Sequence, residues 1–210
     1  MTGAEALIES LLQEQVEHIF GYAGATICPA VDALKAHPEI GYTLVRTEQN
    51  AGHAASGYAR ISGKPGVCMV TSGPGATNLI TGIATAYLDS IPMVAITGQV
   101  PSYLLGRDIF QEVDITGIAM PITKATYLVR DPQTIPDVMR QAFAVAATGR
   151  PGPVLIDIPI DVQEQSLKRF AYPAEVNIRG YKPSVRGNDL QIKRVVDAIA
   201  QSKQPLICAG

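Results

Sequence analysis

Short apolar runs alternate with amphipathic stretches over residues 1–165 of this 210-residue chain, and this alternation limits the fold more than any other feature. Gly or Pro residues bound the apolar runs, which are His18–Phe20, Tyr42–Val45, Val67–Val70, Pro92–Ile96, Thr126–Val129 and Val154–Ile158. Such continuous runs are typical of strands that are covered on both faces. The amphipathic stretches have helical spacing, as in Leu7 and Leu11 or Ile135, Met139 and Phe143. The sequence therefore predicts an α/β fold: a doubly wound, six-stranded, mostly parallel sheet with helices on both faces.

The pattern changes after Asp161, and the sequence predicts three segments. Residues 1–165 form the sheet domain. Residues 166–188 hold scattered Pro, Gly and charged residues without a sustained period, which indicates a linker. Residues 189–210 contain a predicted helix that starts at Asp189 and a predicted strand at Pro205–Cys208. One helix and one strand are too few to bury a core, so we interpret residues 189–210 as the start of a truncated second domain.

Composition argues against several classes of protein. Lys and Arg number 17 against 19 Asp and Glu, a balance that disfavours an electrostatic nucleic-acid binder. No apolar run comes near the ~20 residues that a bilayer-spanning helix needs, and the amino-terminal segment lacks the basic region of a secretory signal. The cysteines, Cys28, Cys68 and Cys208, are far apart without CxxC spacing, so we expect reduced thiols, no metal site and a cytoplasmic protein.

Polar and glycine-rich segments follow the predicted strands, at the edge of a parallel sheet where ligands bind. Glu48 follows the second strand, and Thr71–Asn78, with its Gly73-Pro74-Gly75 turn, follows the third. Each has a simpler interpretation: Glu48 could only stabilise the positive end of the next helix, and the turn could only join a strand to a helix. Because neither G-x-G-x-x-G nor G-x-x-x-x-G-K-[ST] occurs, nucleotide-phosphate binding through those loops is disfavoured.

The predicted helix Gln49–Ile61 is dense in small residues, mainly alanine and glycine. Such a surface lets another backbone approach closely. The charged fraction of the chain is only 17%, which also suggests that surface is covered by partners. We therefore expect this helix to contact a second copy of the chain.

Taken in order, these motifs resemble the amino-terminal, pyrimidine-binding domain of acetolactate synthase large (catalytic) subunits, which are thiamine diphosphate enzymes. The resemblance covers nearly all of the first 160 residues. The motifs that carry it are Phe20-Gly21-Tyr22, Val45-Arg46-Thr47-Glu48-Gln49, Gly57-Tyr58-Ala59-Arg60, Thr71-Ser72-Gly73-Pro74-Gly75-Ala76-Thr77-Asn78, Asp89-Ser90-Ile91-Pro92-Met93, Thr97-Gly98-Gln99-Val100-Pro101, Phe110-Gln111-Glu112-Val113-Asp114 and Gly149-Arg150-Pro151-Gly152-Pro153-Val154.

The resemblance implies that Glu48 is catalytic, since in this family a buried glutamate hydrogen-bonds the cofactor's aminopyrimidine and supports removal of the thiazolium proton. Phe110 and Gln111 match a loop beside the substrate, and Arg150 matches a residue that contacts FAD. The thiamine diphosphate site implied by the resemblance is lined by Tyr22, Ala23, Glu48, Thr71, Pro74, Asn78 and Gln111.

The implied activity is the condensation of pyruvate with a second 2-keto acid, with loss of carbon dioxide, on the route to branched-chain amino acids. Mg²⁺ and the diphosphate need a second domain with a Gly-Asp-Gly motif, which does not occur in these 210 residues, so this segment alone is expected to be inactive. The resemblance further implies a homodimer or tetramer through the pyrimidine domain, a regulatory small subunit as a further partner, and neither nucleic acid nor membrane as partners.

Two positions depart from the family's pattern. Ala23 stands where a proline is usual, and Ile160 stands where the family has a lysine near the FAD and the substrate channel. Ile160 leaves substrate preference and flavin binding open. Two alternatives therefore stay open: another thiamine diphosphate-dependent 2-keto acid carboligase or decarboxylase, or a catalytically silent assembly module. Glu48 argues against one such enzyme, glyoxylate carboligase, which lacks the catalytic glutamate.

Overall fold

The structure, a computed structural model, describes residues 1–208, and its contacts divide them into two compact units. The first unit comprises Met1–Arg179 and holds the sheet, and the second begins at Gly180. The strands are β1 (His18–Tyr22), β2 (Gly41–Leu44), β3 (Gly66–Val70), β4 (Met93–Gln99), β5 (Ala125–Leu128) and β6 (Pro153–Pro159). The helices of the first unit are α1 (Gly3–Gln13), α2 (Cys28–Leu34), α3 (Glu48–Ser62), α4 (Pro74–Asn78), α5 (Ile80–Leu88), α6 (Ile115–Ala119), α7 (Ile135–Ala147) and α8 (Ile160–Glu164).

These strands form one sheet in the order β2-β1-β3-β4-β6-β5, and each described pairing is parallel. The predicted six-stranded α/β sheet is confirmed, and the sheet is more regular than the mostly parallel one expected. The central strands β3, β4 and β6 are buried along their whole length. Their burial on both faces explains why they appear in the sequence as unbroken apolar runs.

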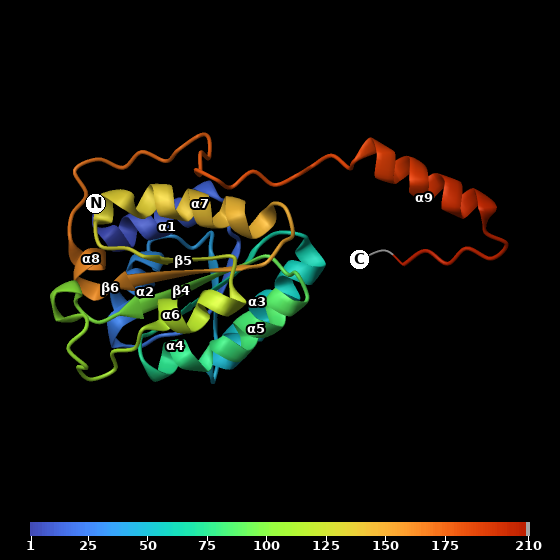
Figure 1. Cartoon of the computed structure of the whole chain (residues 1–210). Helices are drawn as coiled ribbons and strands as arrows, with labels where there is room; N and C mark the ends of the chain where they lie inside the picture. Colours follow the sequence, from blue (N-terminus) through green and yellow to red (C-terminus); the bar gives the residue numbers. More distant parts are fainter. Residues whose placement is uncertain (209–210) are drawn as a thin grey trace. The chain divides into compact units, whose positions relative to one another are not determined.

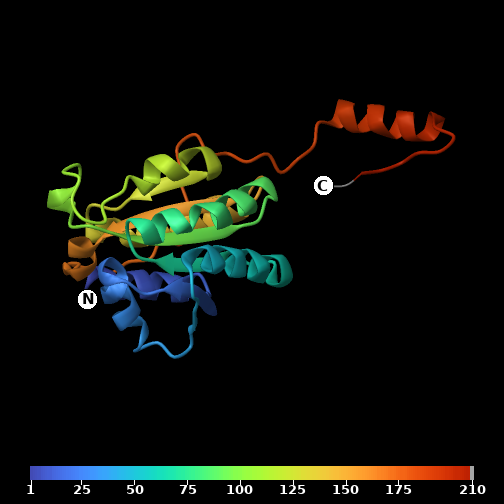
Figure 2. The same cartoon turned by 90° about the horizontal axis from the view of Figure 1, so that it is seen from below.

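Helices cover both faces of the sheet. In Figure 1, α1 and α7 lie along one face, and α3 to α6 lie along the other. Both views show α3 and α5 side by side (Figures 1 and 2). The core on that side combines Ala51 and Ala55 of α3 with Leu79 and Ile83, against the strand residues Cys68 and Val70 among others.

Helix α3 packs on α5 through two glycines. A Cβ atom on Gly52 would lie 3.1 Å from Gly82 Cα, and one on Gly82 would lie 2.9 Å from Gly52 Cα. The small residues of α3 therefore bring a helix of the same chain into close contact. The surface expected to meet a second copy is used in part within the chain, whereas the Cβ position of Gly57 has no neighbour within 4 Å.

The segment that follows the sheet is tied to the first unit without regular structure. Leu167 N donates to Met1 O at 2.9 Å, and Ser166 forms an isolated antiparallel bridge with Thr2. Tyr172 donates its hydroxyl hydrogen to Glu14 at 2.7 Å. The first unit thus extends to Arg179, and the boundary at residue 165 stays a prediction about domains.

In the second unit, α9 (Asp189–Gln201) begins where the sequence predicts a helix, and Asn188 caps it by accepting from the backbone N–H groups of Leu190 and Gln191. The predicted strand at Pro205–Cys208 is wrong, since these residues have no strand structure. A strand requires a hydrogen-bonded neighbour, and this unit offers none among its described residues. No helix of the described part of the chain is long and apolar enough to cross a membrane.

Candidate active site

Glu48 is the first residue of α3, directly after Thr47, whose side chain caps the helix. Its side chain is buried, with 8% of the residue's surface exposed. Asn78, the last residue of α4, donates from Nδ2 to Glu48 Oε2 at 2.9 Å. A carboxylate at the first turn of a helix is also stabilised by the positive end of the helix dipole. The structure therefore brings together Glu48 and Asn78, which the sequence analysis assigned to one site.

Glycines bring the backbone close to this carboxylate. A Cβ atom on Gly75 would lie 2.6 Å from Thr71 Cγ2 and 3.1 Å from Glu48 Oε1. A Cβ atom on Gly24 would also lie 2.6 Å from the Thr71 side chain. Thr71 Oγ1 and Thr26 Oγ1 share a hydrogen bond of 2.9 Å. The carboxyl ends of β1 and β3 thus form a narrow polar corner around Glu48 that larger residues would fill.

One hydroxyl in this corner is left open. The buried Oγ of Ser72 has no hydrogen-bond partner among the described residues. The backbone N–H of Ser72 donates to Thr26 Oγ1 at 3.0 Å. Buried polar atoms normally have a partner, so this unpaired hydroxyl next to the Gly73–Gly75 turn is an exception to the usual pairing.

The loop between β4 and α6 reaches the same corner. Gln111 has a left-handed backbone, with φ of 60°, and a Cβ atom on Gly73 would lie 2.7 Å from Gln111 O. Gly73 itself has φ of 59°. Phe110, the preceding residue, is 86% exposed. A non-glycine residue in this region of backbone space is strained, and such strain is most often kept at functional sites.

The remaining residues assigned to the site lie at the same sheet edge. Tyr22 ends β1, Ala23 follows it, and Pro74 begins α4, and each is exposed to solvent. Ile160 begins α8 directly after β6 and lines a cavity of about 420 Å³ with Ala25, Cys28 and other residues. Their positions agree with the predicted edge, and their contacts with a ligand stay predictions.

A buried network that the sequence analysis did not identify lies behind the loop. Asp157 of β6 is only 2% exposed and accepts from Thr97 Oγ1 at 2.6 Å and from Gln99 Nε2 at 2.9 Å. Burial raises the pKa of Asp157 to about 7, and the two donors oppose this effect in part. An aspartate inside the apolar run Val154–Ile158 was the signal in the sequence, because a buried carboxylate requires partners.

Arg150 lies at the opposite edge of the sheet, just before β6. Its Nε donates to Ser90 Oγ at 2.7 Å, and its Nη2 lies 3.2 Å from Tyr87 O and 3.3 Å from Leu88 O. Its guanidinium also lies over the Tyr87 ring, 5.6 Å from the centroid. Arg150 therefore closes the carboxyl end of α5, and its assignment to FAD stays a prediction.

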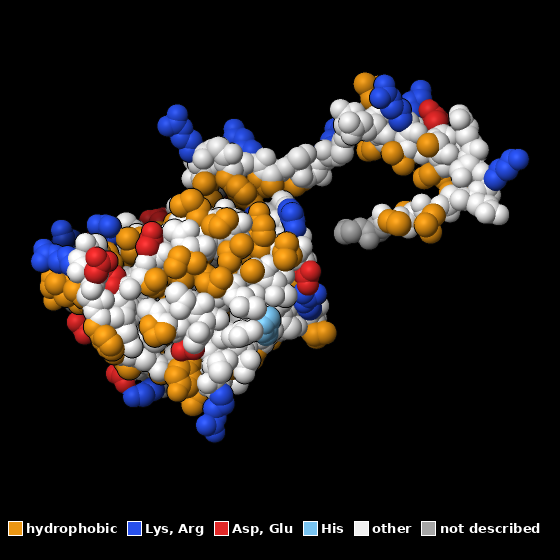
Figure 3. Space-filling model, turned by 60° about the horizontal axis from the view of Figure 1, so that its bottom comes forward, with side chains coloured by type: hydrophobic (Ala, Val, Ile, Leu, Met, Phe, Trp, Pro, Cys, Tyr) orange, Lys and Arg blue, Asp and Glu red, His pale blue; other side chains and the backbone are white. Residues whose placement is uncertain are grey.

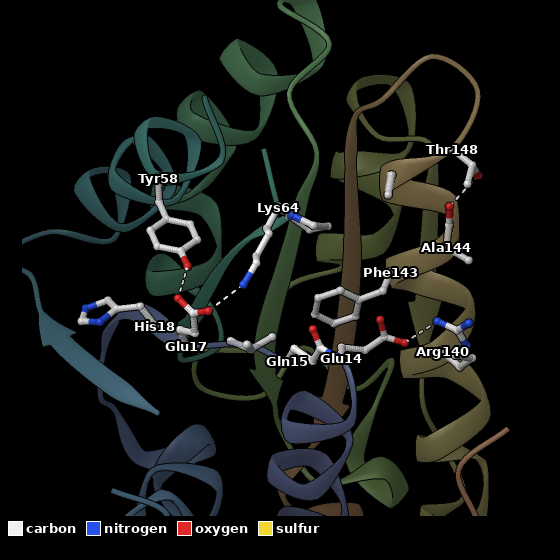
Figure 4. Close-up of a pocket in the computed structure, with 13 residues that line it drawn as sticks. Glu14, Gln15, Glu17, His18, Tyr58, Lys64, Arg140, Phe143, Ala144 and Thr148 are labelled. Atoms are coloured by element: carbon white, nitrogen blue, oxygen red, sulfur yellow. Dashed lines mark hydrogen bonds and ion pairs between the residues drawn. The ribbon is translucent and has the colours of Figure 1, made fainter. Parts of the chain in front are cut away.

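A pocket of about 350 Å³ also lies at this amino edge (Figure 4). Its charged side chains pair with one another: Lys64 with Glu17 at 2.6 Å, and Arg140 with Glu14 at 2.8 Å. Phe143 lies between the two pairs. Each of the four charges is thus neutralised within the chain, and none of the residues assigned from the sequence lies there.

Across residues 1–208, His, Cys, Asp and Glu form no group of three that could hold a metal ion.

Comparison with known proteins gives a consistent result. The model of the family described as thiamine pyrophosphate enzyme, N-terminal TPP binding domain, matches residues 1–118. A probable acetolactate synthase large subunit of Methanocaldococcus jannaschii is 53% identical over all of this chain and 36% of its own length. An acetolactate synthase of Arthrospira platensis is 52% identical, and an acetolactate synthase large subunit of Corynebacterium glutamicum is 50% identical, over all of this chain and 37% and 33% of their lengths. The chain spans about a third of the length of these relatives.

Proposed function

Because the chain belongs to the family of the thiamine pyrophosphate enzyme N-terminal TPP binding domain, we propose that it forms the pyrimidine-binding half of the active site of an acetolactate synthase large subunit. The single observation that carries the proposal is Glu48, a buried carboxylate at the carboxyl edge of the sheet, held by Asn78. The relatives' names supply the activity, and their length implies that other parts of the active site lie outside this segment.

The corner fits the pyrimidine ring of thiamine diphosphate. Glu48 uses Oε2 to accept from Asn78, while Oε1 faces the surface of Gly75, and no donor of the described residues reaches it. The open Oε1 supplies a polar partner for a ring with nitrogen atoms. The missing side chains of Gly24 and Gly75 leave space for a flat ring close to the backbone.

The residues of the chain have separate tasks in this proposal. Glu48 would exchange a proton with the pyrimidine through Oε1, and Asn78 fixes the rotation of the carboxyl group by donating to Oε2. Thr71, hydrogen-bonded to Thr26, packs against Gly24 and Gly75 and would support this contact. Thiamine diphosphate, when bound, supplies the carbon nucleophile for 2-keto acid chemistry. Gln111 and Phe110, on the loop next to Gly73, would contact the keto acid.

The wider assignments belong to the same proposal. Pyruvate is the first substrate and a second 2-keto acid is the acceptor, while Mg²⁺ and the diphosphate are held by a part of the protein outside this chain. We also propose FAD as a cofactor, a regulatory small subunit as a partner and a cytoplasmic location, as the resemblance of the motifs implies; the relatives' designation as large subunits supports the small-subunit partner. Arg150 is the residue of this chain that we assign to FAD.

A homodimer or tetramer is also part of the proposal. Figure 3 turns the helical face with α3 to α6 toward the viewer and shows hydrophobic side chains with few charges across it. Ile61, Leu88 and Met120 are exposed large hydrophobic residues of these helices and their ends. Apolar area of this kind on a folded domain supports an interface.

One observation favours a second candidate. Ile160 stands at the carboxyl edge of β6, where a lysine would place a charge beside the cavity next to Ala25. Without that charge, the acceptor could differ from a 2-keto acid, which favours another thiamine diphosphate-dependent carboligase or decarboxylase.

The test uses the complete gene product with thiamine diphosphate and Mg²⁺. We expect pyruvate to give acetolactate, and pyruvate with 2-ketobutyrate to give acetohydroxybutyrate, both only when the cofactor is present. Release of acetaldehyde without a condensation product would favour the decarboxylase, and glyoxylate as the preferred substrate would favour the other carboligase. A protein that binds the cofactor but converts none of these acids would support the silent module.

A further inference from the structure

The loop that carries Phe110 and Gln111 is attached to the interior of the sheet through one buried amide. We propose that Gln99 is a positioning residue. Its side-chain amide donates to Val113 O and so fixes Gln111 against the Gly73–Gly75 turn. The inference rests on the proposed function for what this loop faces, and it adds a residue that acts on the substrate only through the loop.

The amide of Gln99 has no freedom to rotate. Gln99 is 2% exposed and ends β4. Its Oε1 accepts from Val100 N at 2.9 Å, and its Nε2 donates both hydrogens, one to Asp157 Oδ2 at 2.9 Å and one to Val113 O at 2.8 Å. Every donor and acceptor of this side chain is used, so turning the amide over would break all three bonds.

Asp157 sets this orientation. Its Oδ1 accepts from Thr97 Oγ1 at 2.6 Å, which leaves Oδ2 as the acceptor for Gln99. β4 and β6 are register neighbours here, with Thr97 opposite Asp157, so both partners of Asp157 come from the adjacent strand. The order of contacts runs from the sheet interior outward: Asp157, then Gln99, then the loop carbonyl of Val113.

The loop has other attachments. At Val113, the carbonyl also accepts from Ile115 N at 2.9 Å and the side chain packs against the core, while the remaining attachments act elsewhere along the loop. Ser102 is held by Asp161, from its N–H at 2.8 Å and its hydroxyl at 2.6 Å, at the start of the loop. Glu112 accepts from Ile109 N at 3.1 Å and from Gly106 N, which folds the loop onto itself. The Gln99 bond reaches the residue two positions after Gln111, next to the strained backbone that contacts Gly73.

A purely structural tie between β4 and β6 would have different consequences. Loss of the Thr97–Asp157 bond would weaken the same strand pair, while both hydrogens of the Gln99 amide would keep their acceptors, Asp157 Oδ2 and Val113 O. Loss of the Gln99 side chain would remove the bond that ties Val113 O to the sheet and leave the local bond from Ile115 N, so Gln111 would leave its left-handed conformation more often. Comparison of the two positions therefore separates positioning from general stability.

The experiment compares Gln99→Met with Thr97→Val in the complete gene product. Hydrogen–deuterium exchange of the peptide spanning 105–113 reports on the loop, and steady-state kinetics report kcat and KM for pyruvate. We expect Gln99→Met to raise the exchange rate of the loop amides by about tenfold and KM for pyruvate by about tenfold. This is the effect of losing one buried hydrogen bond. Because Gln111 also belongs to the proposed thiamine diphosphate site, we expect cofactor affinity to fall as well. Thr97→Val should lower the melting temperature similarly and leave loop exchange and KM unchanged.

Gln99→Asn is the second variant, for the case that Gln99→Met does not fold. It keeps an amide but is one methylene shorter, so it cannot reach Asp157 and Val113 together. Wild-type loop exchange in both Gln99 variants, or equal acceleration in Thr97→Val, would overturn the inference. If the wild-type protein converts no keto acid, the proposed function fails, while loop exchange still decides whether Gln99 holds the loop.

Discussion

The two edges of the sheet differ in how their polar groups are used. At the amino edge, Glu14, Glu17, Lys64 and Arg140 surround a pocket, and each charge has an opposite charge within 2.8 Å. At the carboxyl edge, the Glu48 side chain is bound by an amide on one oxygen only, and the nearby Ser72 hydroxyl has no partner among the described residues. Both edges therefore have a cavity, of about 350 Å³ at the amino edge and about 420 Å³ at the carboxyl edge, and the charges at the amino edge are paired within the chain.

This difference teaches that unsatisfied polar atoms indicate the working edge better than a cavity does. An active site that another part of the protein completes is open on one side in this chain. Its signature is a buried carboxylate with an open oxygen and glycines that keep the backbone near it.

The largest effect is expected at Glu48. Glu48→Gln in the complete gene product keeps the shape of the side chain. It replaces the carboxyl group by an amide, which cannot exchange a proton with the cofactor. We expect kcat for acetolactate formation to fall by roughly two orders of magnitude or more, with a melting temperature close to that of the wild type. Glu17→Gln, the same change at the amino edge, should leave kcat within about twofold. Equal losses in both variants would remove the contrast between the edges.

The next effect concerns two glycines. In Gly75→Ala the new methyl group would meet Thr71 Cγ2 at 2.6 Å and crowd Glu48 Oε1 at 3.1 Å. We expect thiamine diphosphate affinity of the complete protein to fall by about tenfold, measured by cofactor titration of activity, since crowding typically costs 1–3 kcal/mol. Gly57→Ala in α3 is the control, because no atom lies within 4 Å of its new methyl group. It should raise stability by about 0.5–1 kcal/mol through helix propensity and leave affinity unchanged.

The raised pKa of Asp157 predicts that the free energy of unfolding depends on pH. Its pKa is raised by burial from 3.8 to about 7 in the folded state, so the folded protein keeps a proton that the unfolded chain releases. This contribution to stability is fully present below about pH 4 and is lost as the pH rises to about 7.

We expect the wild-type free energy of unfolding to carry a falling component of roughly 1 kcal/mol per pH unit in that range, measured by urea titration, and Asp157→Asn to lack it. Asp114 provides the control. Hydrogen bonds from Gly117 N–H and the Thr116 hydroxyl lower the pKa of Asp114, so its contribution to stability is lost only as the pH falls below its ordinary value of 3.8. The charge of Asp114 is the smallest of the causes that shift the pKa of Asp157, so Asp114→Asn should keep most of the falling component between pH 4 and 7. An unchanged slope in Asp157→Asn would mean that Asp157 is ionised throughout.

The smallest effect is expected from the ion pairs of the amino edge. Arg140→Met breaks the pair with Glu14, the carboxylate that also accepts from Tyr172. Because this pair is half-buried, we expect a loss of about 1 kcal/mol in thermal unfolding, and no measurable loss for Lys64→Met, whose pair with Glu17 is exposed. Neither variant should change kcat. A clear loss of kcat in either would give the amino edge a part in the chemistry.

The sequence was sufficient for the elements and for the edge where Glu48 lies. Apolar runs and helical spacing depend on local burial, and they located all six strands and α3 correctly. The contact of Gly73 with Gln111 and the bond from Gln99 to Val113 could not be predicted, because they depend on the loop's path back to the sheet. The strand expected at Pro205–Cys208 shows the limit of local patterns, since an apolar run forms a strand only beside a neighbour.

The strand order has a consequence for how the chain folds. β6 is the last strand in the sequence, yet it lies inside the sheet between β4 and β5, with Met93 paired to Pro153 across the intervening α6, β5 and α7. During synthesis, β4 has an open edge and β5 has no partner until β6 emerges. Because parallel pairings are all between distant segments, folding should be slow, on the order of milliseconds to seconds. A nascent chain that stalls before β6 would expose an apolar edge on which other chains can aggregate.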